Sequence, residues 1–158
     1  MKNKAWKPYL VFVLITEGVG LLAGLLTRQA VDIYGETVLK PALSPPAILF
    51  PIVWTVLYAL MGIGAARVWN TPESADRKRA INIFIIQLAV NFFWSLIFFN
   101  AQAFGFAVLW LLLLWVLVLF MILSFRKVDL TASLLQIPYL LWVTFALYLN
   151  FGVWMLNR

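Results

Sequence analysis

The chain carries no Asp, Glu, Lys or Arg between Ala80 and Phe125. A helix that crosses a bilayer needs about 20 mostly apolar residues, and a polar break at 100–105 (NAQAFG) divides this run into two such lengths. The whole chain is apolar as well, with 65% hydrophobic residues among 158 and a mean hydropathy of +0.97. A soluble domain of this size leaves too much surface in water to hide so many apolar side chains. We therefore expect an all-α integral membrane protein.

Five segments are long and apolar enough to span a membrane, and they predict a five-transmembrane-helix bundle that forms a single domain over residues 1–158. They cover about 9–27, 47–68, 80–99, 104–125 and 130–156. Pro138 either begins the last helix or kinks it. The long connection at 28–46 contains Pro41, Pro45 and Pro46, which forbid a regular helix through them. A loop of this length is typical of a lid over a site, with a plain connector as the alternative.

The basic residues indicate the orientation of the bundle. With five spans, one side of the membrane holds the N-terminus and the loops at 67–79 and 126–129, and the other side holds only Arg28, Lys40 and Arg158. The first side contains Lys2, Lys4, Lys7, Arg67, Arg77, Lys78, Arg79, Arg126 and Lys127. Because cytoplasmic loops are rich in Lys and Arg, we expect a cytoplasmic N-terminus and an external C-terminus. The net charge of +6 lies at span ends, which argues against a nucleic-acid partner.

The first apolar run follows three lysines, as in a signal peptide, but Glu17 interrupts it, so we expect a retained span. An ionisable residue in mid-span indicates either a proton relay or ligand contact, or a neutral carboxyl bonded to a neighbouring helix. The chain has no Cys and no His, which excludes disulfides, a Ser–His–Asp triad and a cysteine nucleophile. We expect no metal site and no resident cofactor.

Polar residues inside the third span lie on one side of a helix. Gln87, Asn91 and Ser95 are four residues apart, and Trp94 is three beyond Asn91. Amides in hydrocarbon need partners, so this face should point into the bundle. The spacing leaves two interpretations open. The side chains either hold helices together by hydrogen bonds, or they line a pocket.

Two further spans present comparable faces. Pro51, Trp54, Tyr58 and Gly62 share one side of the second span, and Tyr139, Trp142, Ala146 and Asn150 share one side of the fifth. The small Ala146 should leave a recess between aromatic rings. Aromatic walls with a few amides suit a flat, largely apolar ligand that carries some polar groups.

The other tryptophans and small residues have simpler interpretations. Trp6, Trp69 and Trp154 fall near span ends, as interfacial residues do. Trp110 and Trp115, in a span without polar residues, should face lipid or another subunit. The pairs Gly20/Gly24 and Gly62/Ala66 are spaced for close approach of helix backbones.

The sequence resembles the TspO/MBR family, the tryptophan-rich sensory protein and translocator protein family, also described as peripheral benzodiazepine receptors. The resemblance covers nearly the whole chain. It is carried by KPALSPPAILFPIVWTVLYALMG (40–62), QLAVNFFWSLIFF (87–99) and PYLLWVTFALYLN (138–150). It implies a five-helix bundle, commonly a homodimer, in a bacterial cell membrane, with a pocket covered by the first loop. The implied ligands are tetrapyrroles such as protoporphyrin IX; many members bind cholesterol or synthetic benzodiazepine-site ligands.

Carried over position by position, the resemblance implies a pocket lined by Trp54, Tyr58, Asn91, Trp94, Tyr139, Trp142, Ala146 and Asn150, with Pro45 and Pro46 in the loop. Gln87 and Ser95 would then only join helices. Two departures stand out. Phe151 and Met155 occupy the places of a Tyr and a basic residue in cholesterol-responsive members, which argues against sterol binding. Leu43 replaces an aromatic residue that relatives often have in the loop, which predicts a weaker contact between the loop and the ligand.

The resemblance also implies a function. We expect a receptor or sensor that binds tetrapyrroles and promotes their light-dependent oxidative degradation, with Trp54 and Trp142 as electron donors. Without His or Cys, metal-free porphyrin should bind more tightly than axially ligated haem. One alternative is a transporter of porphyrins or other small hydrophobic ligands, although this chain lacks the internal repeat that is usual in transporters. The other is a scaffold protein in which the amides serve only to hold the helices together.

Overall fold

The computed structural model describes residues 5–158, so Lys2 and Lys4 lie outside the described part. Its helices are α1 (Lys7–Thr37), α2 (Leu49–Trp69), α3 (Ala75–Ser95), the π-helix η2 (Leu96–Asn100), α4 (Phe104–Arg126), α5 (Leu130–Leu134) and α6 (Ile137–Leu156). In the described chain, five helical segments are long and apolar enough to cross a membrane when η2 is counted with α3 and α5 with α6. The predicted all-α, five-span architecture is confirmed.

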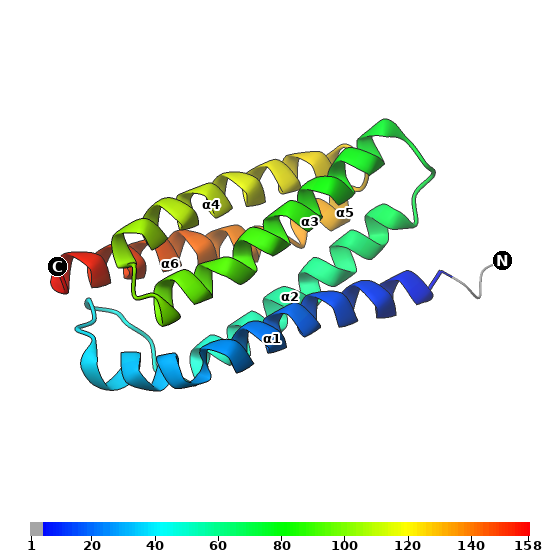
Figure 1. Ribbon diagram of the computed structural model, residues 1–158. Helices are drawn as coiled ribbons and strands as arrows, with labels where there is room; N and C mark the ends of the chain where they lie inside the picture. The colour runs from blue at the N-terminus through cyan, green and yellow to red at the C-terminus, as the bar shows by residue number, and fades with distance from the viewer. Residues whose placement is uncertain (1–4) are drawn as a thin grey trace.

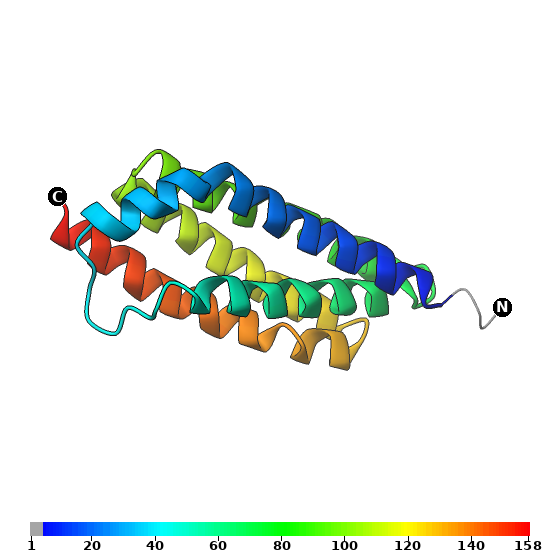
Figure 2. The ribbon, with the colours of Figure 1, turned by 90° about the horizontal axis from the view of Figure 1, so that it is seen from below.

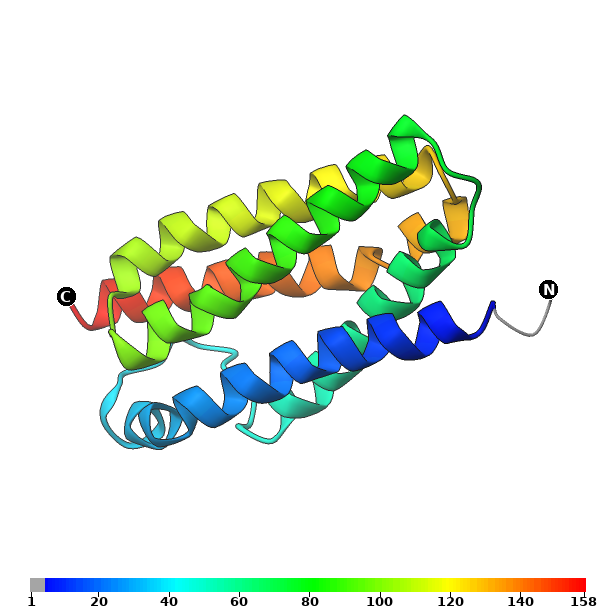
Figure 3. The same cartoon turned by 45° about the vertical axis from the view of Figure 1, so that its right-hand side comes forward.

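Successive spans run in opposite directions, so the start of α1 and the end of α6 lie at opposite ends of the bundle (Figure 1). α1 packs along α2, and α4 packs against both α3 and α6. Figure 3 shows α1 and α2 on one side of the bundle and the α3–α4 pair on the other, with α6 behind them. The backbones of α2 and α6 stay further apart than those of the packed pairs α1–α2 and α4–α6.

Helix α1 is longer than the sequence predicted. We expected it to end near residue 27, but it continues to Thr37, so residues 28–37 are helix and not loop. At about 1.5 Å per residue, the added turns carry α1 beyond the apolar stretch, whose end marks a membrane boundary and not a helix boundary. Lys40 then closes the helix, because its ammonium donates to the carbonyl oxygens of Tyr34 (3.2 Å) and Gly35 (3.2 Å).

The loop that remains, residues 38–48, crosses the end of the bundle toward α6 (Figure 2). Asn157, just after α6, holds it through both ends of its amide: Leu39 N–H donates to Asn157 Oδ1 (3.0 Å), and Asn157 Nδ2 donates to Leu39 O (2.8 Å). Tyr148 of α6 donates its hydroxyl to Ala42 O (2.8 Å). We call residues 38–48 the lid loop, and these contacts with α6 the latch.

Three other boundaries follow from capping and proline. α3 begins at Ala75, five residues before its apolar stretch, because the Ser74 hydroxyl accepts a hydrogen bond from Arg77 N–H and caps the helix. The last span is interrupted, since α5 ends at Leu134 and α6 starts at Ile137. Pro138 lies in the first turn of α6, where its missing N–H costs nothing. It therefore begins the helix and does not kink it.

Small residues let α1 and α2 approach closely, as the spacing predicted for Gly20 and Gly62. A Cβ added to Gly62 would lie 2.6 Å from Val13 Cα of α1, and one added to Gly20 would collide with the Tyr58 ring. Thr16 adds a hydrogen bond to Tyr58 O (2.7 Å). Gly24 has nothing within 4 Å of an added Cβ, so it does not take part in this packing.

An ion pair joins two elements at the end of the bundle where α1 begins. Arg67 Nε donates to Asp129 Oδ1 at 3.0 Å, and Asp129 also caps α5 by accepting from Ala132 N–H (2.7 Å). Burial alone would raise the pKa of Asp129, but the hydrogen bonds from Arg67 and Ala132 outweigh it, and the pKa lies below its usual value. The pair ties α2 to the turn between α4 and α5.

A buried aromatic and amide site between α2, α3 and α6

Four polar side chains from three helices form one buried chain of hydrogen bonds. Tyr58 of α2 donates to Asn91 Oδ1 (2.6 Å), and Asn91 Nδ2 donates to the Tyr139 hydroxyl (2.7 Å). Tyr139 of α6 then donates to Gln87 Oε1 (2.8 Å). All four side chains are buried. The predicted polar faces of α2, α3 and α6 therefore do converge inside the bundle.

The same chain of bonds changes the interpretation of the third span. Asn91 uses both its amide oxygen and its amide nitrogen on phenols of neighbouring helices, and Gln87 belongs to the same chain. Ser95 does not join helices, contrary to the prediction. Its hydroxyl donates to Phe92 O of its own helix (3.0 Å), because a helical serine can satisfy itself on the preceding turn.

Trp94 and Asn150 meet nearer the lid loop. The indole N–H of Trp94 donates to Asn150 Oδ1 (3.1 Å), and Asn150 Nδ2 donates to Phe104 O (2.9 Å). The Trp94 ring stacks on Phe98 of the π-helix with ring centres 5.1 Å apart. These two predicted site residues thus satisfy each other across α3 and α6, and they anchor the start of α4.

Trp54 and Trp142 pair with aromatic rings across the seam between α2 and α6. The Trp54 ring lies 5.4 Å from that of Tyr58 and 6.2 Å from that of Tyr139. The Trp142 ring meets the edge of Phe50, with ring centres 5.9 Å apart. The Trp54–Tyr139 and Phe50–Trp142 pairs are edge-to-face, which is favourable for aromatic quadrupoles, whereas Trp54 and Tyr58 are tilted neighbours within α2. Phe50 was not predicted as a site residue, although it lies one helical turn before Trp54.

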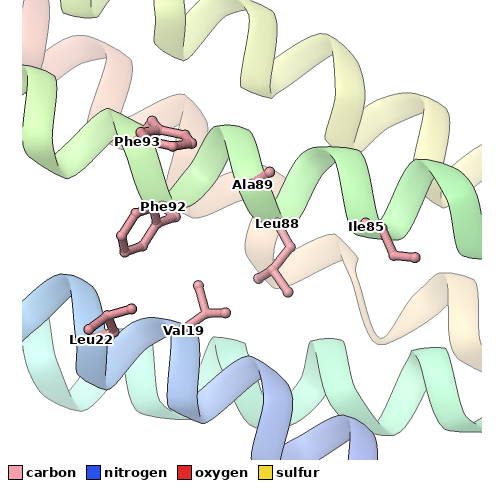
Figure 4. Close-up of a pocket in the computed structure, with 7 residues that line it drawn as sticks. All are labelled: Val19, Leu22, Ile85, Leu88, Ala89, Phe92 and Phe93. Carbon is pink, nitrogen blue, oxygen red and sulfur yellow. The ribbon is translucent and has the colours of Figure 1, made fainter.

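An apolar groove of about 530 Å³ runs beside this seam. Its walls come from α2 and α6 and from no other helix, and they comprise Ile52, Val53, Val56, Leu57, Pro138, Leu141, Trp142 and Phe145. A second groove, of about 300 Å³, lies between α1 and α3 and is also lined by apolar side chains (Figure 4). Only the first groove contains a residue of the predicted site.

The remaining predicted site residues lie at the margins. Ala146 is buried and belongs to the hydrophobic core of the bundle. Pro45 is half-buried and Pro46 is exposed in the lid loop, and the carbonyl of Pro46 accepts from Leu49 N–H (3.0 Å) to start α2. Glu17 is half-buried on α1. The described residues hold no group of three His, Cys, Asp or Glu able to bind a metal ion.

The sequence predicted that Trp110 and Trp115 face lipid or another subunit, but their indole N–H groups are bonded to neighbouring helices of the bundle. Both are half-buried at helix seams. Trp110 N–H donates to Val90 O (2.8 Å) between α4 and α3, and Trp115 N–H donates to Thr144 Oγ1 (2.9 Å) between α4 and α6. An indole N–H needs a protein acceptor where no water is present, and an apolar helix surface gives no sequence signal for where that acceptor lies.

Sequence reasoning also missed the latch. Asn157 follows the last apolar turn and Tyr148 lies on the outward side of α6, where 43% of it is exposed. The side chains of both residues bind backbone atoms of the lid loop. Because any residue type has these backbone atoms, the sequence of the loop does not reveal the contact. A Cβ added to Gly152 would lie 2.6 Å from Pro41 Cβ, and the glycine is the one signal that the loop approaches α6 closely.

Together the fold and the site define a multi-pass α-helical membrane protein with a buried face of aromatic and amide side chains and a loop bound to α6 at one end of the bundle. The TspO/MBR family model matches residues 12–155, and the chain belongs to this family. It is 39% identical over 143 residues to the tryptophan-rich protein TspO of Chlorobaculum tepidum, covering 88% of this chain and 89% of that protein.

Two other relatives extend the comparison. The tryptophan-rich sensory protein of Cereibacter sphaeroides is 33% identical over 155 residues, which cover 98% of this chain and 94% of that protein. The human translocator protein is 34% identical over 121 residues, which cover 75% of this chain and 72% of that protein. The chain thus matches most of the length of both bacterial and animal relatives.

Proposed function

We propose that the protein binds a tetrapyrrole such as protoporphyrin IX against the aromatic face that Trp54 and Trp142 present between α2 and α6. The observation that carries this proposal is the state of the indole N–H groups. Those of Trp94, Trp110 and Trp115 are bonded to protein acceptors, whereas those of Trp54 and Trp142 have no partner among the described residues. The same holds for Trp6, Trp69 and Trp154 near the span ends, so Trp54 and Trp142 are the mid-bundle indoles with an N–H left to donate. Neither nitrogen is fully buried, because Gln136 Oε1 is the one fully buried side-chain N or O atom without a partner in residues 5–158.

Two half-buried indoles with free N–H groups can stack on a flat ring and donate to its polar substituents. The buried chain of hydrogen bonds supports them from behind, because Tyr58 and Tyr139 hold the Trp54 ring and are themselves held by Asn91. We therefore assign Asn91 a positioning role and Trp54 and Trp142 the ligand contacts. The names of the relatives, sensory protein and translocator protein, agree with a membrane receptor for a small ligand.

Light-dependent degradation of the bound porphyrin is part of the proposal. An excited porphyrin accepts one electron from an indole, which leaves a porphyrin radical anion and a tryptophan radical cation. Dioxygen is the oxidant that later ring opening requires. Trp54 and Trp142 are the donors nearest the proposed ligand, and no conventional acid, base and nucleophile set is needed.

The binding test is a titration of the purified protein with protoporphyrin IX in the dark, followed by illumination of the saturated complex. We expect saturable binding, and loss of porphyrin absorbance that slows in Trp54→Phe and Trp142→Phe. Trp115→Phe is the matched control, because its indole is bonded at the α4–α6 seam. Equal rates of breakdown in all variants, including the double variant at Trp54 and Trp142, would refute the photochemical role and leave binding intact.

Transport is the competing function, and it predicts porphyrin flux across the membrane of proteoliposomes, whereas a receptor gives no flux.

We further propose a homodimer in a bacterial cell membrane with a cytoplasmic N-terminus. The described cations favour this orientation, since most lie at the end where α1 begins. The chain has no cysteine, so Glu73→Cys and Leu43→Cys each introduce a single thiol. When intact cells are treated with a membrane-impermeant thiol reagent, only the Leu43→Cys protein should react.

A further inference from the structure

The seam between α2 and α6 is held unevenly along its length. At the end away from the lid loop, Gln136 donates to Leu60 O (3.0 Å), and the bonds of Tyr58 and Tyr139 to Asn91 join the two helices through α3. Gln136 is the N-cap residue of α6, and apart from its bond no hydrogen bond in the described structure runs directly from α2 to α6. Toward the lid loop, the contacts across the seam are aromatic, and they are the pairs Trp54–Tyr139 and Phe50–Trp142.

The lipid side of this seam is the 530 Å³ groove. Every residue that lines it is apolar, and Val56 on its rim is 54% exposed. Trp142 belongs both to the groove wall and to the Phe50–Trp142 pair. A molecule dissolved in the bilayer can therefore reach Trp142 from the side without crossing any polar group, and parting two edge-to-face ring pairs breaks no hydrogen bond.

The lid end of the bundle is closed more firmly. Asn157 makes two hydrogen bonds to Leu39, and Tyr148 makes one to Ala42. Pro41 packs on Gly152, where even an added Cβ would lie only 2.6 Å away. A motion of the lid loop that opened this end to water would break these contacts.

We propose that the ligand comes from the lipid phase and reaches the site sideways between α2 and α6, with Phe50, Trp54, Tyr139 and Trp142 acting as a lateral gate while the lid loop stays latched. This inference rests on the proposed function, because it concerns the access route to that site. It restricts the ligand class to flat aromatic molecules that partition into membranes.

A disulfide lock tests the lid end. Pro41→Cys with Gly152→Cys places the new Cβ 2.6 Å from that of residue 41, shorter than the usual disulfide spacing of about 3.8 Å. The loop must therefore move outward by about 1 Å for the disulfide to form, in a chain that has no other cysteine. Association of protoporphyrin IX, supplied in the bilayer of nanodiscs, is followed by quenching of tryptophan fluorescence. We expect the oxidised and reduced forms to associate at rates within about twofold of each other. Leu39→Cys with Asn157→Cys is a second lock for the same test.

Filling the groove tests the lateral gate. Val56→Trp should slow association by about tenfold, because the new ring occupies the approach to Trp142. Ile85→Trp is the matched control, since Ile85 lines the groove between α1 and α3 (Figure 4) and is 56% exposed, close to the 54% of Val56. Its association rate should match that of the unmodified protein.

Three results would overturn the lateral route. One is an oxidised lock that slows association by about tenfold and recovers on reduction. Another is a Val56→Trp variant no slower than Ile85→Trp. The third is a Val56→Trp variant with weaker equilibrium binding but an unchanged association rate, since the groove would then be part of the site and not its approach. Absence of quenching in the unmodified protein would instead refute the proposed function, and the route with it.

Discussion

Replacing Asn91 with alanine should destabilise the protein, because this residue joins Tyr58 of α2 to Tyr139 of α6. Two hydrogen bonds are lost. Tyr139 keeps its hydrogen bond to Gln87 (2.8 Å). Losing the bond from Asn91 to Tyr139 therefore costs about 0.6 kcal/mol, the average for a hydrogen bond between membrane helices. Tyr58 loses the acceptor of its buried hydroxyl, which costs about 1–3 kcal/mol. The expected sum, with a small void, is about 2–4 kcal/mol.

The measurement is the free energy of unfolding in mixed micelles titrated with sodium dodecyl sulfate. Tyr58→Phe should cost about 1 kcal/mol on its own and clearly less in the Asn91→Ala background, where its hydroxyl has no acceptor to lose. That difference is the coupling energy of the pair. Ser95→Ala is the control on the same helix. Its hydroxyl bonds only to Phe92 O, so it should cost less than about 0.5 kcal/mol.

If the Asn91→Ala protein is as stable as the Ser95→Ala protein, the Asn91 amide does not stabilise the packing of the helices. Strict additivity of Asn91→Ala and Tyr58→Phe would show that the 2.6 Å contact between their side chains contributes nothing. Either result would refute the positioning role of Asn91, and the arrangement of the rings of Tyr58, Tyr139 and Trp54 would then need another support.

Two further predictions concern packing and charge. Gly62→Ala should destabilise the bundle by about 1–3 kcal/mol, because the new methyl would lie 2.6 Å from the Val13 backbone. Gly24→Ala is the control and should be neutral or stabilising, because the space around it is open. Equal effects of the two substitutions on thermal stability would contradict this packing of α1 on α2. Since hydrogen bonds lower the pKa of Asp129 in the folded protein, its stabilising contribution is present above the unfolded pKa of about 3.9 and lost as pH falls through the folded value. Asp129→Asn should therefore cost about 1 kcal/mol at neutral pH and nothing in strong acid, and a penalty that persists below pH of about 2 would contradict the assignment.

The architecture was predictable because a membrane imposes one length on every span. Uninterrupted apolar runs and the alternation of basic loops locate five crossings without any knowledge of packing. The same signal failed at α1, since hydropathy reports where the bilayer ends and the helix goes on to Thr37. It failed again at Ala75, where the capping serine and not apolarity sets the start of α3.

The sequence predicted which side of each helix carries the site residues, but it did not predict which atoms form hydrogen bonds with each other. Spacing put Gln87, Asn91 and Ser95 on one side of α3, yet it cannot tell that Asn91 reaches two phenols and that Ser95 turns back on its own helix. Those outcomes depend on distances between helices. Phe50 and Asn157 were missed for the same reason, since a ring pair or a contact with loop backbone needs the partner helix in place.

The central claim is that a tetrapyrrole lies against Trp142 and Trp54, and the dissociation constant of protoporphyrin IX in Trp142→Ala tests it most directly. Trp115→Ala is the reference, because it removes the same ring from the α4–α6 seam. Loss of a stacked indole should weaken binding by about 10- to 100-fold, while Trp115→Ala stays within about threefold of the unmodified protein. Equal dissociation constants for the two variants would contradict the account.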